Sequence, residues 1–167
     1  MANFKELLPS INTFIFDVDG VLTDGSVLLL PNGELARKMN NRDGFALQHA
    51  IRKGYNICII SGGNSASVRV RLNDLGITDV FLKAHDKVDV FNKYIAQKNI
   101  SKNQILYMGD DIPDLEAMKL CGVATCPKNA AIEIKNVAHY ISDKNGGEGC
   151  VRDVIEQVLR CNDNWNN

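Results

Sequence analysis

The stretch that decides the fold reads Thr13-Phe14-Ile15-Phe16-Asp17-Val18-Asp19-Gly20-Val21-Leu22-Thr23-Asp24-Gly25. Its first four residues form an apolar run of the kind that predicts a short strand buried on both faces. The run ends in two carboxylates separated by one residue, and a carboxylate at the end of a buried strand is costly without a partner. Gly20 then permits a sharp turn. The stretch therefore predicts a core strand that delivers Asp17 and Asp19 to one edge of a sheet.

Strand and helix patterns alternate along the rest of the chain. Further buried strands are expected over 56–60, 80–82, 105–108, 123–125 and 139–141. Helices are expected over about 44–53 with Asp43 as the cap, around 68–75, over 86–98, from about 113, and around 151–159. Pro31-Asn32-Gly33 lies between the runs 27–30 and 34–39 and predicts a hairpin. We expect an α/β fold, a Rossmann-like three-layer sandwich with a mainly parallel central sheet and a small β-hairpin.

Length, charge and cysteine content narrow the class of protein. The chain has 167 residues, with 19 Lys and Arg against 20 Asp and Glu, and this suits one domain over 1–167, with a hairpin at about 26–39 and a C-terminal segment at about 146–167. The balanced charge and the absence of a long apolar run predict no nucleic-acid and no membrane partner. Five cysteines without Cys-x-x-Cys pairs, and an N-terminus without a signal pattern, predict reduced thiols and a cytoplasmic protein.

Polar residues follow the predicted strands at the edge where ligands bind in parallel sheets. Asp17 and Asp19 follow the first strand, Ser61 the second, and Lys87 opens the helix after the third. Gly109-Asp110-Asp111 and Asp114 follow the strand 105–108. Several carboxylates at one edge require a cation, and oxygen ligands favour a hard metal such as Mg2+. A carboxylate nucleophile, a hydroxyl and a lysine beside such a metal indicate phosphoryl transfer.

These motifs, in this order, resemble those of the haloacid dehalogenase superfamily of phosphatases. The four motifs are Asp17-x-Asp19-Gly20-Val21-Leu22-Thr23, Ser61, Lys87 and Gly109-Asp110-Asp111-x-x-Asp114. The resemblance implies that Asp17 is the nucleophile, that Asp19 is the general acid and base, and that Ser61 and Lys87 hold the phosphoryl group. It also implies Mg2+ held by Asp17, the backbone carbonyl of Asp19 and Asp110, with Asp111 or Asp114 in support.

The spacing of the motifs resembles the uncapped branch that contains the 3-deoxy-D-manno-octulosonate 8-phosphate (KDO 8-phosphate) phosphatases. The gap between Asp17 and Ser61 holds only the hairpin and one helix, so the hairpin stands in place of a cap domain. The resemblance implies a phosphatase of lipopolysaccharide precursor synthesis that acts as a homotetramer joined by its hairpins. It further implies that the segment 146–152, Gly-Gly-Glu-Gly-Cys-Val-Arg, reaches a neighbouring active site.

The same resemblance implies a set of substrate-binding residues: Asp19, Asn40, Asn41, Arg42, Asp43, Gly44, Gly62, Arg71, Lys87 and Arg152. Many relatives carry charged residues near the positions of Gln48 and Gly63, so the substrate remains open between KDO 8-phosphate and a sialic-acid-type nonulosonate 9-phosphate. A phospho-accepting receiver domain is a different alternative, because it also uses acids, a hydroxyl and a lysine on a parallel sheet. Arg152 could also simply solvate the last helix.

Overall fold

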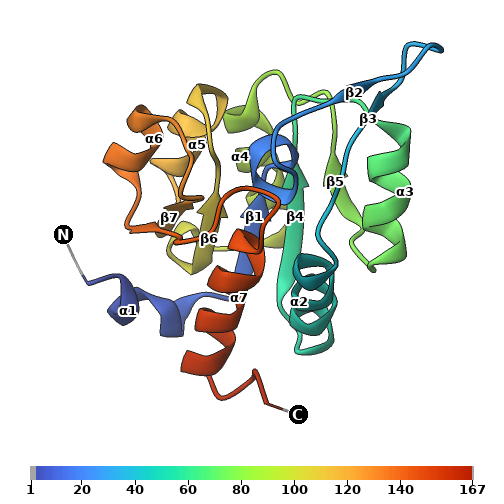
Figure 1. Ribbon diagram of the computed structural model, residues 1–167. Coiled ribbons are helices and arrows are strands. Elements are labelled where there is room, and N and C mark those ends of the chain that lie inside the picture. The colour runs from blue at the N-terminus through green and yellow to red at the C-terminus, as the bar shows by residue number, and fades with distance from the viewer. Residues whose placement is uncertain (1–2, 167) are drawn as a thin grey trace.

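The computed structural model describes residues 3–166, which fold into a three-layer α/β structure around a six-stranded sheet (Figure 1). Every strand pair in this sheet is parallel, and the strand order is β5-β4-β1-β6-β7-β8. The strands are β1 (Thr13–Phe16), β4 (Asn56–Ile60), β5 (Asp79–Phe81), β6 (Ile105–Met108), β7 (Val123–Cys126) and β8 (Tyr140–Ile141). The predicted α/β class with a mainly parallel sheet is confirmed.

The strand order reverses beside β1. From β1 the chain adds β4 and β5 on one side, and it then returns to add β6, β7 and β8 on the other. β1 and β6 run in register with Phe16 opposite Met108, and the amide of Asp17 donates to the carbonyl of Met108 at 3.2 Å. Ligands of such sheets bind where the order reverses, beyond the carboxyl ends of the strands. The residues that follow β1 and β6 therefore lie at the expected position of a site.

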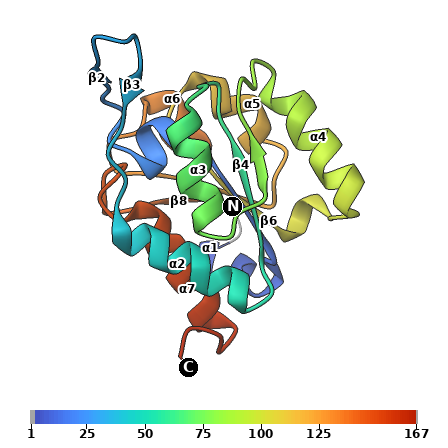
Figure 2. The same cartoon turned by 90° about the vertical axis from the view of Figure 1, so that its right-hand side faces the viewer.

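Helices cover both faces of the sheet (Figures 1 and 2). Successive side chains of a strand point to opposite faces, so each central strand packs against helices on both sides. Phe14 and Phe16 are buried against α2 and α7, whereas Ile15 is buried against α4, α5 and α6. The helices are α1 (Phe4–Leu7), α2 (Asn41–Arg52), α3 (Ala66–Asp74), α4 (Lys87–Lys98), α5 (Leu115–Met118), α6 (Ile132–Val137) and α7 (Cys150–Cys161). Over residues 3–166, none of the helices has the length and apolar character needed to cross a membrane.

The predicted hairpin is present, with shorter strands than expected. β2 (Leu28–Leu29) pairs antiparallel with β3 (Leu35–Ala36). The turn between them contains Gly33 at φ +85°, a backbone conformation that favours glycine. The hairpin projects beyond the rest of the molecule in both views (Figures 1 and 2), and Leu28 and Leu29 are 66% and 74% exposed.

The start of α2 corrects one prediction. Asn40 caps this helix, and its side-chain oxygen accepts from the amide of Arg42 at 2.8 Å. Asp43 lies inside the helix and is buried, so its prediction as the cap was wrong. The local signal was ambiguous because Asn and Asp are both good cap residues.

The helix expected from about residue 113 is also shorter than its pattern suggested. A single 3-10 turn, Ile112–Asp114, precedes the one-turn α5. The sequence pattern did not predict α1 or α6, because helices of one or two turns show too little of the 3.6-residue period.

Candidate active site

A buried lysine joins two carboxylates at the carboxyl edge of the sheet. Lys87, the first residue of α4, places its Nζ 2.7 Å from Asp114 and 3.1 Å from Asp17. The hydroxyl of Tyr107 donates to the same Asp114 oxygen at 2.9 Å. Burial alone would lower the pKa of Lys87, but the two carboxylates raise it above its usual value. Lys87 is therefore a fixed cation beside Asp17.

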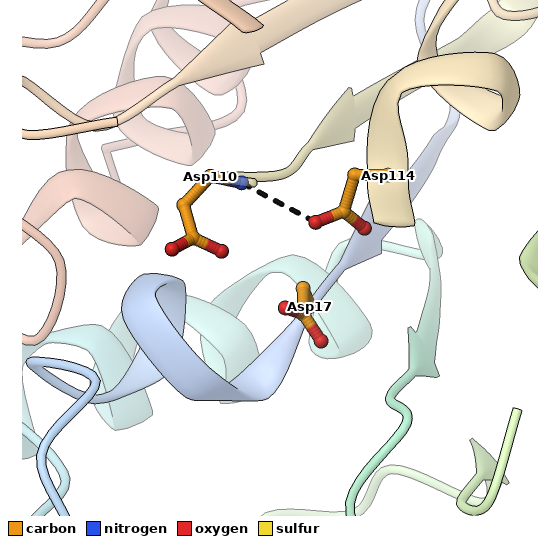
Figure 3. A group of neighbouring side chains, drawn as sticks. All are labelled: Asp17, Asp110 and Asp114. Carbon is orange, nitrogen blue, oxygen red and sulfur yellow. Dashed lines mark hydrogen bonds between the residues drawn. The ribbon is translucent and has the colours of Figure 1, made fainter. Parts of the chain in front are cut away.

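Figure 3 shows three carboxylates that converge, and Lys87 contacts two of them. Asp17 follows β1, Asp110 follows β6, and Asp114 lies in the turn before α5, and each offers an oxygen within 4.8 Å of the others. Burial and the neighbouring Asp114 raise the pKa of Asp17 to about 7, against the lowering effect of Lys87. Burial, Asp114 and Asp111 raise the pKa of Asp110 to about 7. The cluster therefore holds more negative charge than its buried surroundings stabilise.

This excess charge fits a divalent cation. The converging donors are all carboxylate oxygens, which suit a hard ion such as Mg2+. The structure brings together two of the predicted ligands, Asp17 and Asp110, with Asp114, one of the two predicted supporting residues. The other predicted supporting residue, Asp111, is exposed and caps the next turn by accepting from the amide of Ile112 at 2.8 Å.

Glycine at position 20 allows the two strand ends to approach each other. Gly20 has φ +87°, and a Cβ at this position would collide with the carboxylate of Asp110. Gly109 has no room for a side chain because Asp114 packs against it. The close packing of the acidic cluster therefore requires glycine at both motif positions, 20 and 109.

The predicted catalytic residues share one pocket of about 320 Å3. Asp17, Asp19, Ser61 and Lys87 all contribute to its walls, as does the predicted substrate residue Gly62. Ser61 is buried, and its Oγ accepts from the amide of Gly63 at 3.2 Å. The sequence analysis did not select His85, which is exposed and lines the same pocket next to Ala84. Its position two residues before Lys87 was the available signal.

A second residue that the sequence analysis did not select is Arg37. It follows β3 of the hairpin, and its guanidinium forms two hydrogen bonds with the carboxylate of Asp19. Its neighbour Lys38 is exposed. Two adjacent basic residues in a hairpin look alike in sequence, so no signal marked the one that turns inward.

The predicted substrate residues outside this pocket form two separate groups. Arg71 of α3 donates to the side chain of Asn41 at 3.2 Å and lies against Gly44. Arg42 and Arg152 line a different groove beside α7. The guanidinium of Arg152 lies 5.3 Å from the ring centroid of Trp165 and donates to Glu156 at 3.2 Å. Within one chain, neither group lines the pocket that contains Asp17.

The glycine-rich segment packs against the loop that follows Asp17. The amide of Gly147 donates to the carbonyl of Val21 at 2.9 Å, and its carbonyl accepts from the side chain of Asn40 at 3.3 Å. Gly146 lies so close to the carbonyl of Gly20 that no Cβ would fit. This segment thus supports the active-site loop of its own chain.

Comparison with known proteins identifies the class. Residues 73–155 match the family model for haloacid dehalogenase-like hydrolases. The chain is 32% identical to the 3-deoxy-D-manno-octulosonate 8-phosphate phosphatase KdsC of Haemophilus influenzae, over 93% of this chain and 87% of that protein. It is 31% identical to the KdsC protein of Yersinia pestis, over 92% and 82% of the two chains.

Solved structures agree with these relatives. The Yersinia pestis phosphatase superposes with a TM-score of 0.95 at 29% identity, covering 98% of this chain and 89% of that one. The Moraxella catarrhalis phosphatase, solved with magnesium ion, phosphate ion and KDO, gives a TM-score of 0.94 at 32% identity, covering 99% and 95%.

Fold, site and comparisons together define a haloacid dehalogenase-like hydrolase. Within that class, the chain belongs to the family of 3-deoxy-D-manno-octulosonate 8-phosphate phosphatases. The predicted family is confirmed, and the receiver alternative is set aside.

Proposed function

We propose that this chain is a Mg2+-dependent phosphatase that hydrolyses KDO 8-phosphate to KDO and phosphate, a step in lipopolysaccharide precursor synthesis. The observation that carries the proposal is the shared pocket of Asp17, Asp19, Ser61 and Lys87 beside the carboxylate cluster. The printed function of the relatives supports the substrate. The five free cysteines fit a reducing cytoplasm as the place of action.

The proposed reaction has two steps. An oxygen of Asp17 attacks the phosphorus, the bond to the sugar oxygen breaks, and Asp19 gives that oxygen a proton. Asp19 then takes a proton from the water that attacks the aspartyl phosphate, which releases phosphate and regenerates Asp17. Ser61 and Lys87 position the phosphoryl group. Mg2+ held by Asp17, Asp110 and the backbone carbonyl of Asp19 would neutralise the charge of that group.

We also propose that the enzyme acts as a homotetramer joined by the hairpins, with each chain, 1–167, forming one catalytic domain. Two observations support assembly. Leu28, Leu29 and Leu35 of the hairpin are exposed, and large exposed apolar patches mark interaction sites. The predicted cations for a sugar carboxylate, Arg42, Arg71 and Arg152, lie outside the Asp17 pocket of their own chain. In the tetramer, the segment from Gly146 to Arg152 reaches a neighbouring active site through Arg152, while Gly146 and Gly147 stay packed against the loop after β1 of their own chain.

The test is phosphate release from a panel of phosphate esters with Mg2+. The kcat/KM for KDO 8-phosphate should exceed that for glucose 6-phosphate by at least about tenfold, or about 1.4 kcal/mol. Equal values for the two esters would overturn the sugar-acid assignment. A preference for a nonulosonate 9-phosphate would support the alternative substrate while preserving the reaction type.

A further inference from the structure

The side chain of Arg37 is committed entirely to Asp19 and to its own hairpin. Its Nε and one terminal nitrogen lie 2.5 and 3.1 Å from the two carboxylate oxygens of Asp19. Its other terminal nitrogen donates to the carbonyl of Leu35 at 2.8 Å. Only 8% of the Arg37 side chain is exposed, against 35% for Asp19. The guanidinium therefore has a fixed orientation, and it holds the Asp19 carboxylate, which is otherwise exposed to the pocket.

The loop after β4 closes around this pair. A Cβ on Gly63 would lie 3.3 Å from an oxygen of Asp19 and 3.5 Å from a nitrogen of Arg37. A side chain at position 63 would therefore crowd the Asp19 carboxylate and contact Arg37. The hairpin, the loop that follows β1 and the loop that follows β4 all meet at this point. A solvated surface arginine would not require such packing.

A two-point contact between guanidinium and carboxylate fixes the plane of the carboxylate as well as its position. Proton transfer depends on that orientation, because the oxygen must face the atom that gains or loses the proton. We propose that Arg37 is a positioning residue that holds the Asp19 carboxylate in the orientation needed for proton transfer in the pocket. The inference rests on the proposed function, in which Asp19 is the general acid and base.

Kinetics on two kinds of ester test this role. In Arg37→Ala, kcat for the sugar phosphate should fall roughly 10- to 100-fold, within the range for losing a positioned acid, while KM changes less than about threefold. The first turnover of p-nitrophenyl phosphate should keep at least about one third of its rate, since nitrophenolate leaves without a proton. Arg37→Lys should be intermediate, because an ammonium cannot form the fork. Lys38→Ala is the matched control and should behave as wild type.

A double-mutant cycle tests whether Arg37 acts through Asp19. If it does, Asp19→Asn/Arg37→Ala should turn over no more slowly than Asp19→Asn alone. The inference would be overturned if the double variant lost the product of the two single-variant factors in kcat. It would also be overturned if Arg37→Ala raised KM with unchanged kcat, or turned over faster than wild type. Thermal unfolding of each variant shows whether it is folded. If Arg37→Ala does not fold, the same kinetic comparison is made with Arg37→Lys.

The same series separates the two proposals. Wild-type turnover of the sugar phosphate by Asp19→Asn would overturn the acid–base part of the proposed function. Slow turnover by Asp19→Asn combined with normal turnover by Arg37→Ala would overturn only the role of Arg37.

Discussion

The backbone amide of Arg152 donates a 2.8 Å hydrogen bond to the buried carboxylate of Asp43, which lies 109 residues earlier in the chain. Arg152 is in the first turn of α7. Gly149, at the cap position of that helix, has no side chain that could accept a hydrogen bond from the first amides of the helix. Asp43 supplies the missing acceptor from α2. It also places a carboxylate at the positive end of the α7 dipole. The second oxygen of Asp43 has no hydrogen-bond partner among residues 3–166.

We expect Asp43 to make stability fall as pH rises. Burial raises the pKa of Asp43 from 3.8 to about 6, so its stabilising contribution is complete below about 3.8 and is lost as pH rises through 6. Relative to Asp43→Asn, the free energy of unfolding of wild type should drop by up to about 3 kcal/mol between pH 4 and pH 7, then stay level. Denaturant titration at several pH values measures this difference. A difference between wild type and Asp43→Asn that does not change with pH would contradict the prediction.

Substitutions of Asp17 and Asp19 should reduce catalysis to different extents. Asp17→Asn should abolish phosphate release, because a carboxamide cannot replace the nucleophile. Asp19→Asn should lower kcat by about 10² to 10⁴, the usual contribution of acid–base catalysis. Single-turnover phosphate release measures both effects. Near-normal turnover by Asp17→Asn is incompatible with the proposed mechanism.

Protons should compete with Mg2+ for the carboxylate cluster. Without metal, the pKa values of Asp17 and Asp110 are raised to about 7, so the unbound site destabilises the fold increasingly as pH rises above 4 toward 7. The rise in Tm on adding Mg2+ should therefore be larger at about pH 8 than at about pH 5.5. Thermal unfolding with Mg2+ and with a chelator tests this. In Asp110→Asn the rise should be small at both pH values, and a larger rise for wild type at the lower pH would refute the prediction.

Charge on the hairpin should weaken assembly and activity together. Leu29→Glu introduces a carboxylate at a side chain that is 74% exposed in the single chain. If hairpins join the tetramer, this variant should sediment as smaller species with weakened catalysis although Asp17 and Asp19 are unchanged. Ile132→Glu, at a position 65% exposed on α6, is the matched control and should leave both properties unchanged. A fully active Leu29→Glu monomer would refute this role for the hairpin.

Much of the fold and the centre of the site could be predicted from local patterns. The buried strands appear in the sequence as apolar runs, and α7 shows a clear helical period. Because the carboxyl ends of parallel strands lie at one edge of the sheet, Asp17, Ser61 and Asp110 come together there. These predictions succeeded because each depends on neighbours in sequence plus one general property of parallel sheets.

The remaining features depend on contacts between distant segments. Asp43 precedes a helical pattern, so it was read as a cap for α2, whereas it serves α7. Arg37 reaches Asp19, 18 residues earlier, only because the chain passes the loop after β1 as it leaves the hairpin. Arg152 stacks on Trp165, a contact set by the path of the chain after α7. No local pattern encodes any of these partners.

The packing of Gly146 and Gly147 against the loop after β1 has a consequence for the order in which the protein is made. Synthesis proceeds toward the C-terminus, so Asp17 leaves the ribosome well before Gly146 and Gly147. Gly147 supplies a backbone hydrogen bond to that loop, and the partner of Asp43, the amide of Arg152, also lies far along the chain. A nascent chain that stops before residue 146 would contain Asp17, Asp19, Ser61, Lys87 and Asp110 but would lack the segment that packs against the loop after β1. We expect the nascent chain to become catalytically competent only after α7 has left the ribosome.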